Sequence, residues 1–153
     1  MNNTKLIISD EDNTTNINMK KTQKKGLKRD TIDKFYTKPE VVNECLKLFK
    51  KRFRLKSNEL VIEPSAGNGA FIDGIKTLGM NNSCPQYRFY DLEPEHTDIE
   101  KQDYLLFNGE TLSNYQRIHV IGNPPFGRQS SLAIKFIKKS CEFADSVSFI
   151  LPK

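Results

Sequence analysis

The stretch ELVIEPSAGNGAF, residues 59–71, reads as a buried strand, a glycine loop and the start of a helix. Residues 59–63 form a short apolar run with β-branched members, which predicts a strand. Gly67 and Gly69 allow a tight turn in which a ligand approaches the backbone closely, and a helix over residues 70–78 would add unpaired N–H groups. No lysine follows the glycines, so the loop is not a phosphate-binding P-loop.

Acidic residues stand where the next strands should end. Residues 86–92 predict a second strand, and Asp91 lies 28 residues after Glu63, the length of one right-handed strand-helix-strand crossover. We therefore expect both carboxylates at neighbouring strand tips, where Asp91 could hold the two hydroxyls of a ribose. Asp103 and Tyr104 follow after a short polar segment. Each acid alone could be a loop residue or a helix cap, but together they predict a nucleoside pocket.

A later strand ends in a rigid polar corner. The strand is predicted over residues 118–122, and Asn123, Pro124, Pro125 and Phe126 follow it directly. Proline fixes φ, has no N–H and keeps the preceding residue extended, so the carbonyls of Asn123 and Pro124 should be displayed at the strand end beside an aromatic ring. The alternative is a strand terminator that leads into a turn.

The remaining segments predict the fold class. Thr37 and Glu40 have the spacing of a capping box, which indicates a helix that continues to about residue 53. A helix over residues 132–143 and a last strand over residues 147–151 follow the polar corner. Five strands with intervening helices or crossovers are typical of a doubly wound parallel α/β sheet.

The first 30 residues differ in composition from the rest of the chain. They hold seven basic and four acidic residues, which is +3 of the total net charge of +5, and few apolar ones. We predict that residues 1–30 form a disordered basic tail and that residues 31–153 form one domain. The basic residues of the tail suit either contact with nucleic acid or a solvated charge run.

Composition also limits the classes of site and location. Cys45, Cys84 and Cys141 are far apart and form no CxxC motif, so neither a metal site nor a disulfide framework is indicated. No apolar run has the length of a membrane span, and the N-terminus has no apolar signal core. We therefore expect a soluble intracellular protein, cytoplasmic or nuclear.

The strand-end motifs resemble, in kind and in order, those of class I S-adenosylmethionine-dependent methyltransferases. More narrowly, they are similar to the enzymes of the NPPF type that modify N6 of adenine in DNA or RNA. The resemblance covers roughly residues 33–153 and includes residues 35–39 ahead of the glycine loop. It implies a Rossmann-like sheet, S-adenosylmethionine as cofactor and nucleic acid as substrate.

The resemblance also implies roles for individual residues. In the cofactor site, the methionine end would be contacted by Tyr36 and Thr37, the amino acid portion would be lined by Glu63, Ala66 and Gly67, the ribose would be held by Asp91, and the adenine would be bound by Asp103 and Tyr104. The catalytic residues would be Asn123, Pro124, Pro125 and Phe126. Of these, Asn123 and Pro124 would accept hydrogen bonds from the target amine, and Phe126 would stack on the target base.

The resemblance leaves alternatives for substrate and activity. The same tetrapeptide occurs in families that methylate guanine N2 in RNA, cytosine N4 or a protein glutamine, and a non-catalytic remnant would keep only binding. The Tyr36-Thr37 motif and Phe126 favour adenine. Class I sheets normally carry two further strands after the fifth, so we expect a C-terminally truncated sheet whose edge at residues 147–151 pairs with a missing segment or a partner chain.

Overall fold

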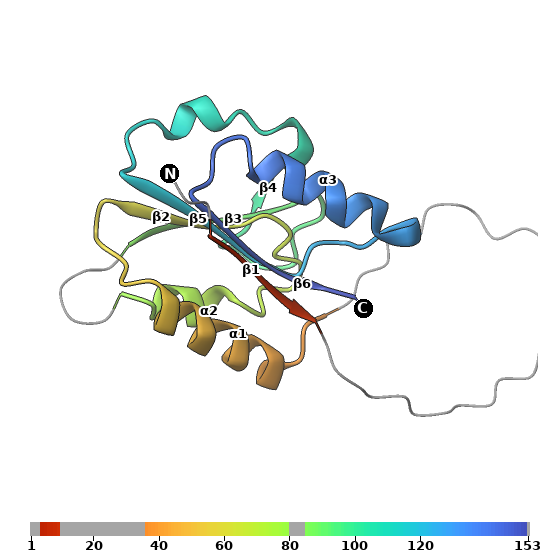
Figure 1. Cartoon of the computed structure of the whole chain (residues 1–153). Helices are drawn as coiled ribbons and strands as arrows, with labels where there is room; N and C mark the ends of the chain where they lie inside the picture. The colour runs from red at the N-terminus through yellow and green to blue at the C-terminus, as the bar shows by residue number, and fades with distance from the viewer. Residues whose placement is uncertain (1–3, 10–35, 80–84, 153) are drawn as a thin grey trace, which may run out of the picture.

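The computed structural model describes residues 4–9, 36–79 and 85–152, with only the backbone described for residues 4–9. Within these ranges the strands form one sheet in the order β1-β6-β5-β2-β3-β4, and every pairing is parallel (Figure 1). The strands are β1 (Thr4–Ser9), β2 (Glu59–Glu63), β3 (Gln86–Asp91), β4 (Glu100–Lys101), β5 (Arg117–Gly122) and β6 (Ser146–Leu151).

Helices cover both faces of this sheet. Figure 1 shows α1 and α2 on one face and α3 on the other, with the short helical turns that surround it in the chain. The α-helices are α1 (Pro39–Arg52), α2 (Ile72–Lys76) and α3 (Ser131–Ser140). The 3₁₀ turns are η1 (Tyr104–Leu106), η2 (Gly109–Leu112) and η3 (Arg128–Ser130). Leaving β1 aside, the order β4-β3-β2-β5-β6 is the 3-2-1-4-5 order of the class I methyltransferase sheet, which confirms the predicted fold class.

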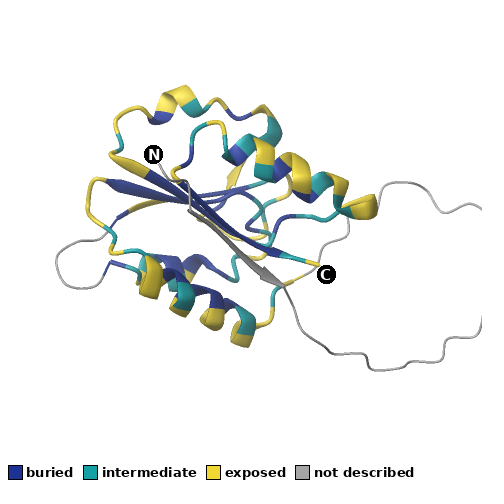
Figure 2. Ribbon diagram, in the orientation of Figure 1, coloured by how far each residue is buried: buried dark blue, intermediate teal, exposed yellow. Residues whose placement is uncertain are grey.

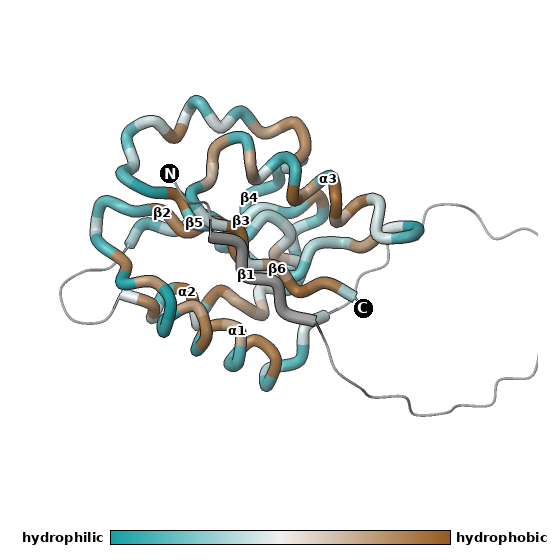
Figure 3. The backbone as a smooth tube through the Cα atoms, in the orientation of Figure 1, coloured by the Kyte–Doolittle hydropathy of each residue, from teal (hydrophilic) through white to brown (hydrophobic). Residues whose placement is uncertain are grey.

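The central strands β2, β5 and β6 are buried because most of their residues are apolar on both sides of the sheet. All five residues of β2 are buried, as expected for a central strand of a parallel sheet. Val61 packs in the cluster beneath α1 and α2, while Leu60 and Ile62 pack in the cluster beneath α3. Figure 2 shows the buried strands between helices with exposed outer faces, and Figure 3 shows hydrophobic stretches along the strands.

α1 packs against the sheet through one apolar face. Val42, Cys45, Leu46 and Phe49 recur at helical spacing and are all buried, and the ring of Phe49 is fully inaccessible to solvent. The predicted capping box does not form, because Lys38 is the N-cap residue and no side chain caps this end. The Thr37 hydroxyl instead accepts a hydrogen bond from the side chain of Asn123, as described below.

Two other helices are shorter than the sequence pattern predicts. α2 starts at Ile72 rather than at residue 70, because the amide nitrogens of Gly69 and Ile72 bond to Ala66 and Gly69 in turns that continue the glycine loop. α3 ends at Ser140 rather than at residue 143. The chain there leaves the helix in a turn in which the Ala144 amide donates to the Ser140 carbonyl.

The prediction of a disordered tail is wrong for six of its residues. The backbone of Thr4–Ser9 forms β1, which pairs in parallel along the whole of β6, from Thr4 opposite Ser146 to Ser9 opposite Leu151. The edge of β6 that the sequence suggested would be open is therefore covered by β1. Residues 10–30 of the predicted tail lie outside the described residues. In the part of the chain that is described, no helix combines the length and apolarity needed to span a membrane.

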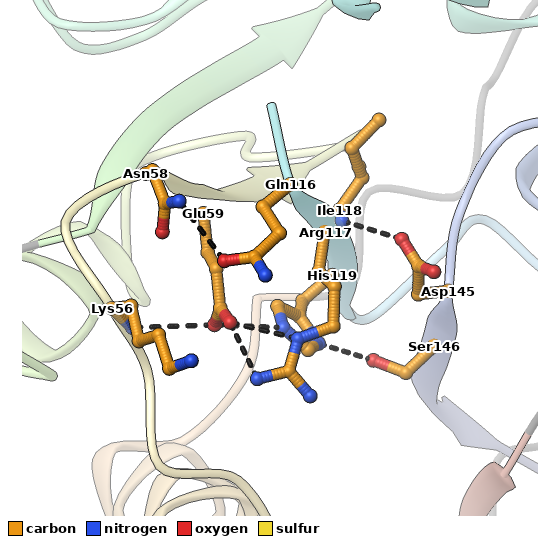
Figure 4. A network of polar contacts seen from close by, with 9 residues as sticks. All are labelled: Lys56, Asn58, Glu59, Gln116, Arg117, Ile118, His119, Asp145 and Ser146. Carbon is orange, nitrogen blue, oxygen red and sulfur yellow. Dashed lines mark hydrogen bonds and ion pairs between the residues drawn. The ribbon is translucent and has the colours of Figure 1, made fainter. Parts of the chain in front are cut away.

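A polar network ties the amino ends of three strands together (Figure 4). Glu59 is fully buried, and its carboxylate accepts a hydrogen bond of 2.7 Å from Arg117 Nε and lies 3.4 Å from His119 Nε2. The other ring nitrogen of His119 lies 2.7 Å from Ser146 Oγ. Burial lowers the pKa of His119 even though Glu59 opposes this shift, so the ring is neutral near pH 7. The network lies at the opposite ends of the strands from the motifs singled out in the sequence.

Candidate active site

A cavity of about 200 Å³ opens where β2, β3 and β5 end, the usual ligand position in open α/β sheets. Nine of the twelve predicted site residues line it: Tyr36, Gly67, Asp91, Asp103, Tyr104, Asn123, Pro124, Pro125 and Phe126. Thr37, Glu63 and Ala66 lie outside its wall. The walls also contain residues that the sequence analysis did not predict, namely Pro64, Ser65, Leu92, Glu93, Gln102, Leu105, Leu132 and Phe136.

Asn123 is held by contacts from two distant segments. Its side-chain amide donates a hydrogen bond of 3.1 Å to Thr37 Oγ1, just before α1, and its backbone carbonyl accepts one of 3.1 Å from Ser65 Oγ in the glycine loop. With the amide nitrogen turned to Thr37, Asn123 Oδ1 is a buried acceptor that has no partner among the described residues. A buried polar atom without a partner costs free energy, so this oxygen is suited to accept from a ligand.

Asp91 joins the glycine loop to the tip of β3. Its Oδ2 accepts a 2.8 Å hydrogen bond from the Gly67 amide, and its Oδ1 accepts one of 2.8 Å from the Glu93 amide. Gly67 has φ of 54°, a left-handed conformation that favours glycine. The two backbone donors fix the carboxylate at the cavity, where its remaining lone pairs can accept from hydroxyl groups.

Asp103 and Tyr104 lie together at the next corner. The Asp103 carboxylate accepts a hydrogen bond of 2.9 Å from the Leu105 amide and so caps η1. Tyr104 is buried, its hydroxyl lies 2.8 Å from Ser140 Oγ, and its ring stacks on Phe136 with centroids 5.3 Å apart. Burial raises the pKa of Tyr104, so it stays a neutral wall of the cavity.

Two leucines complete the apolar part of this wall. Leu92 directly follows Asp91 and is nearly half exposed, and Leu105 directly follows Tyr104. A large apolar residue directly after a strand-end acid is the signal that could have identified Leu92 from the sequence. Burial of either leucine by a ligand ring would remove apolar surface from water.

Glu63 lies beneath the cavity rather than on its wall. The side chain is buried, and its Oε2 has no hydrogen-bond partner among the described residues. Burial, with a smaller contribution from the charge of Asp91, raises the pKa of Glu63 from 4.5 to about 8. A carboxyl group in such a position is protonated at neutral pH and becomes a carboxylate readily only when a donor or a positive charge approaches it.

Tyr36 and Phe126 form the outer rim. Tyr36 is about half exposed, and its hydroxyl donates to the Glu95 carboxylate at 2.9 Å. The backbone carbonyl of Phe126 accepts hydrogen bonds from the amides of Leu132 and Ala133 at the start of α3. The backbone of Phe126, whose ring is predicted to stack on a base, is therefore anchored to the first turn of this helix.

Comparisons with known proteins identify the family. Residues 55–152, 98 of the 153, match the model of the EDM2 methyltransferase-like domain. The chain belongs to this methyltransferase-like family. The matched region of the EDM2 methyltransferase-like domain contains the glycine loop, both strand-end acids and the Asn-Pro-Pro-Phe corner, so the resemblance to methyltransferases found in the sequence is confirmed.

Curated relatives of this EDM2-like domain are longer than the chain. The chain is 28% identical over 109 residues to the type II methyltransferase M.HincII of Haemophilus influenzae. This alignment covers 69% of the chain and 19% of the relative. The chain is 23% identical over 130 residues to the protein ENHANCED DOWNY MILDEW 2 of Arabidopsis thaliana, which covers 82% of the chain and 10% of the relative. The chain thus spans a fifth or less of the length of these proteins.

A solved structure supports the fold. The crystal structure of a proposed RNA methyltransferase from Pyrococcus horikoshii superposes with a TM-score of 0.59 at 22% identity. The superposition covers 76% of this chain and 62% of the archaeal one. At 22% identity, this likeness shows that the two chains share the α/β fold.

Proposed function

We propose that this domain transfers a methyl group from S-adenosylmethionine to the exocyclic amine of a planar base, with N6 of adenine in nucleic acid as the target. The observation that carries the proposal is the fixed Asn123 amide, whose Oδ1 is buried at the cavity without a partner among the described residues. An acceptor held in this way matches an N–H donor, and the proline next to it adds a backbone carbonyl.

The chemistry explains why two acceptors suit this reaction. The lone pair of an exocyclic amine is delocalised into the heteroaromatic ring, which makes the nitrogen a poor nucleophile. Asn123 Oδ1 and the Pro124 carbonyl would accept hydrogen bonds from its two N–H groups and draw them out of the ring plane, which favours a tetrahedral nitrogen for in-line attack on the methyl group. No strong base is required, because positioning and preorganised dipoles lower the barrier.

The cavity has groups that fit S-adenosylmethionine, which when bound supplies an electrophilic methyl group on a sulfonium. Asp91 would accept hydrogen bonds from its ribose hydroxyls, and the buried Glu63 carboxyl group, whose Oε2 has no partner among the described residues, would bind its positively charged amine. Asp103 would accept from the adenine amine, with Leu92 and Leu105 against the ring. Tyr36, Thr37, Ala66 and Gly67 would surround the methionine end.

Phe126 supports a base as the target. Its ring lies on the cavity wall next to Asn123 and Pro124, and base stacking on an aromatic side chain contributes about 1–3 kcal/mol. A base in a duplex would have to be flipped out of the stack to reach this corner. The preference for adenine rests on the Tyr36-Thr37 motif and on phenylalanine as the fourth residue of the corner.

The test combines cofactor binding with product identification. The chain and its Asn123→Ala variant would be incubated with labelled S-adenosylmethionine and DNA or RNA oligonucleotides, and the digested nucleosides analysed by mass spectrometry. We expect N6-methyladenine with the chain, its loss by at least 100-fold in the variant, and equal cofactor binding by calorimetry. Label on another base or on protein would replace the adenine assignment, and binding without transfer to any substrate would favour the non-catalytic alternative.

A further inference from the structure

The segment that follows the Asn-Pro-Pro-Phe corner carries only positive charge. From Phe126 to Cys141 the sequence holds Arg128, Lys135, Lys138 and Lys139 and no acidic residue. Lys139 forms an ion pair with Glu142, in which Lys139 Nζ lies 2.8 Å from Glu142 Oε2. Arg128, Lys135 and Lys138 are exposed, and we call these three residues the basic ridge.

Helical spacing places two residues of the ridge, Lys135 and Lys138, on the outer side of α3, and Arg128 lies in η3 just before this helix. Ser131, Lys135 and Lys138 are four and three residues apart and so share one helix face, while Ala133, Phe136 and Ser140 are buried on the opposite face. At 1.5 Å per residue, the distance from Ser131 to Lys138 is about 10 Å, which corresponds to about three nucleotides of one strand.

The loop that carries Arg128 is held in an unusual conformation next to the cavity. Gln129 and Ser130 have φ of 52° and 57°, so two consecutive residues other than glycine are left-handed, and Gly127 has φ of 67°. Such strain persists where surrounding contacts impose it and is concentrated at functional sites. Here the Phe126 carbonyl accepts hydrogen bonds from the Leu132 and Ala133 amides, so the loop that carries Arg128 is closed between Phe126 and the first turn of α3.

We propose that the basic ridge binds the phosphate backbone of the nucleic-acid strand on one side of the target base. The proposal rests on the proposed function for the position of that base. Its own support is the uncompensated charge between Phe126 and Cys141, the shared helix face of Lys135 and Lys138, and the presence of Leu132 and Phe136 of the same helix on the cavity wall. Lysine and arginine near phosphates release counterions, which gives affinity without reading sequence.

α1 offers a matched control. It exposes Lys47, Lys50 and Lys51 on the opposite face of the sheet, as Figure 1 shows for the two helices. Unlike α3, this helix also carries acidic residues, Glu40 and Glu44, and Glu44 Oε2 lies 3.8 Å from Lys47 Nζ. The ridge variant Arg128→Gln/Lys135→Gln/Lys138→Gln and the α1 variant Lys47→Gln/Lys50→Gln/Lys51→Gln remove the same charge. All six side chains are exposed, so both variants should fold.

The experiment measures binding of a labelled single-stranded oligonucleotide of 20 nucleotides by fluorescence anisotropy at 50–200 mM KCl. We expect the ridge variant to weaken binding at least tenfold and to reduce the slope of log K against log salt by about 2, from three phosphate contacts at about 0.7 each. The α1 variant should remain within twofold of the unmodified chain. Unfolding by urea and calorimetric binding of S-adenosylmethionine should be unchanged in both.

Three outcomes would contradict the proposal that the basic ridge binds the phosphate backbone. One is an equal loss of binding in the two variants, which would reflect overall charge. Another is unchanged oligonucleotide binding by the ridge variant. The third is displacement of the oligonucleotide by polyglutamate at the same charge concentration, which would indicate an acidic protein partner. Failure of methyl transfer by the unmodified chain, with binding that still depends on the ridge, would reject the proposed activity and leave the ridge in place.

Discussion

Thr37 and Asn123 are 86 residues apart in the chain, and a side-chain hydrogen bond of 3.1 Å joins them. Thr37→Val keeps the shape of the side chain but removes the acceptor for the Asn123 amide. One hydrogen bond contributes about 0.5–1.5 kcal/mol, so we expect methyl transfer to fall about 3- to 10-fold. Initial rates at saturating S-adenosylmethionine would measure the fall, and Thr37→Ser should restore most of the rate. A Thr37→Val rate equal to that of the unmodified chain would show that the amide is oriented by other contacts.

Glu63 should make stability depend on pH in an unusual direction. In the unfolded chain its carboxyl ionises above about pH 4.5, whereas the folded chain keeps the proton until about pH 8. The folded state therefore binds more protons between these values, and the free energy of unfolding should fall as the pH rises through this window and level off above it. Glu63→Gln resembles the protonated acid and should lack this fall.

The measurement is the difference between the two chains, because other groups titrate in both. Urea unfolding from pH 5 to pH 9 should show the Glu63→Gln variant gaining about 3–5 kcal/mol relative to the unmodified chain across the window. Parallel stability curves would mean that Glu63 is solvated or paired in solution.

Residue types at strand ends could be predicted from the sequence because each motif has local chemistry. Asp91, Asp103 and Asn123 do lie together at the cavity. The partners that orient them could not be predicted, since they depend on tertiary contacts. Thr37 has the spacing of a helix cap, and only the fold reveals that its hydroxyl meets Asn123 instead. Ser65 could not be predicted for a similar reason, because nothing local indicates that its hydroxyl donates to the Asn123 carbonyl.

Among the elements, the central strands β2, β5 and β6 are joined at their amino ends by the network around Glu59. Glu59→Gln keeps the volume but removes the charge that pairs with Arg117. Arg117 is partly exposed and can turn to water, so the loss should be about 1–3 kcal/mol rather than the larger cost of a fully buried pair.

Urea unfolding of this variant at pH 7 would give the loss, and calorimetry should find unchanged S-adenosylmethionine binding, because the network and the cavity lie at opposite ends of the strands. A variant as stable as the unmodified chain would show that desolvation of Glu59 cancels its contacts. A weakened cofactor affinity would contradict the separation of the two ends.

Strands could be predicted more accurately than helix ends. A buried parallel strand is a compact apolar run, and β2 has the predicted bounds of 59–63. The helix pattern of α2 extends over residues that the loop uses for turns, since Gly69 and Ile72 are bonded backwards to Ala66 and Gly69. Periodicity reports which residues face the core but not which of them carry helical hydrogen bonds.

At the scale of the whole molecule, β1 is the element that the sequence least indicated. Thr4–Ser9 lies in a stretch whose overall composition is polar and charged, and its position depends on a long-range pairing with β6. The local sequence pattern cannot reveal such a pairing, because a short segment forms a strand only where the unpaired edge of a sheet provides partners for its backbone hydrogen bonds. The parallel α/β class of the sheet needed no such contact, because it follows from the succession of strands and helices along the chain.

The pairing of β1 with β6 can be tested in the full chain. The double substitution Ile7→Pro/Ile8→Pro places prolines at successive residues whose amides point to opposite sides, so at least one backbone donor to β6 is lost. We expect the free energy of unfolding to fall by about 1–3 kcal/mol and sedimentation velocity to detect more self-association, because the apolar edge of β6 becomes available to other chains. Ile7→Val/Ile8→Val keeps both backbone donors and is the control, so it should change neither quantity. If the double-proline chain behaves like this control, β1 contributes nothing to the sheet in solution.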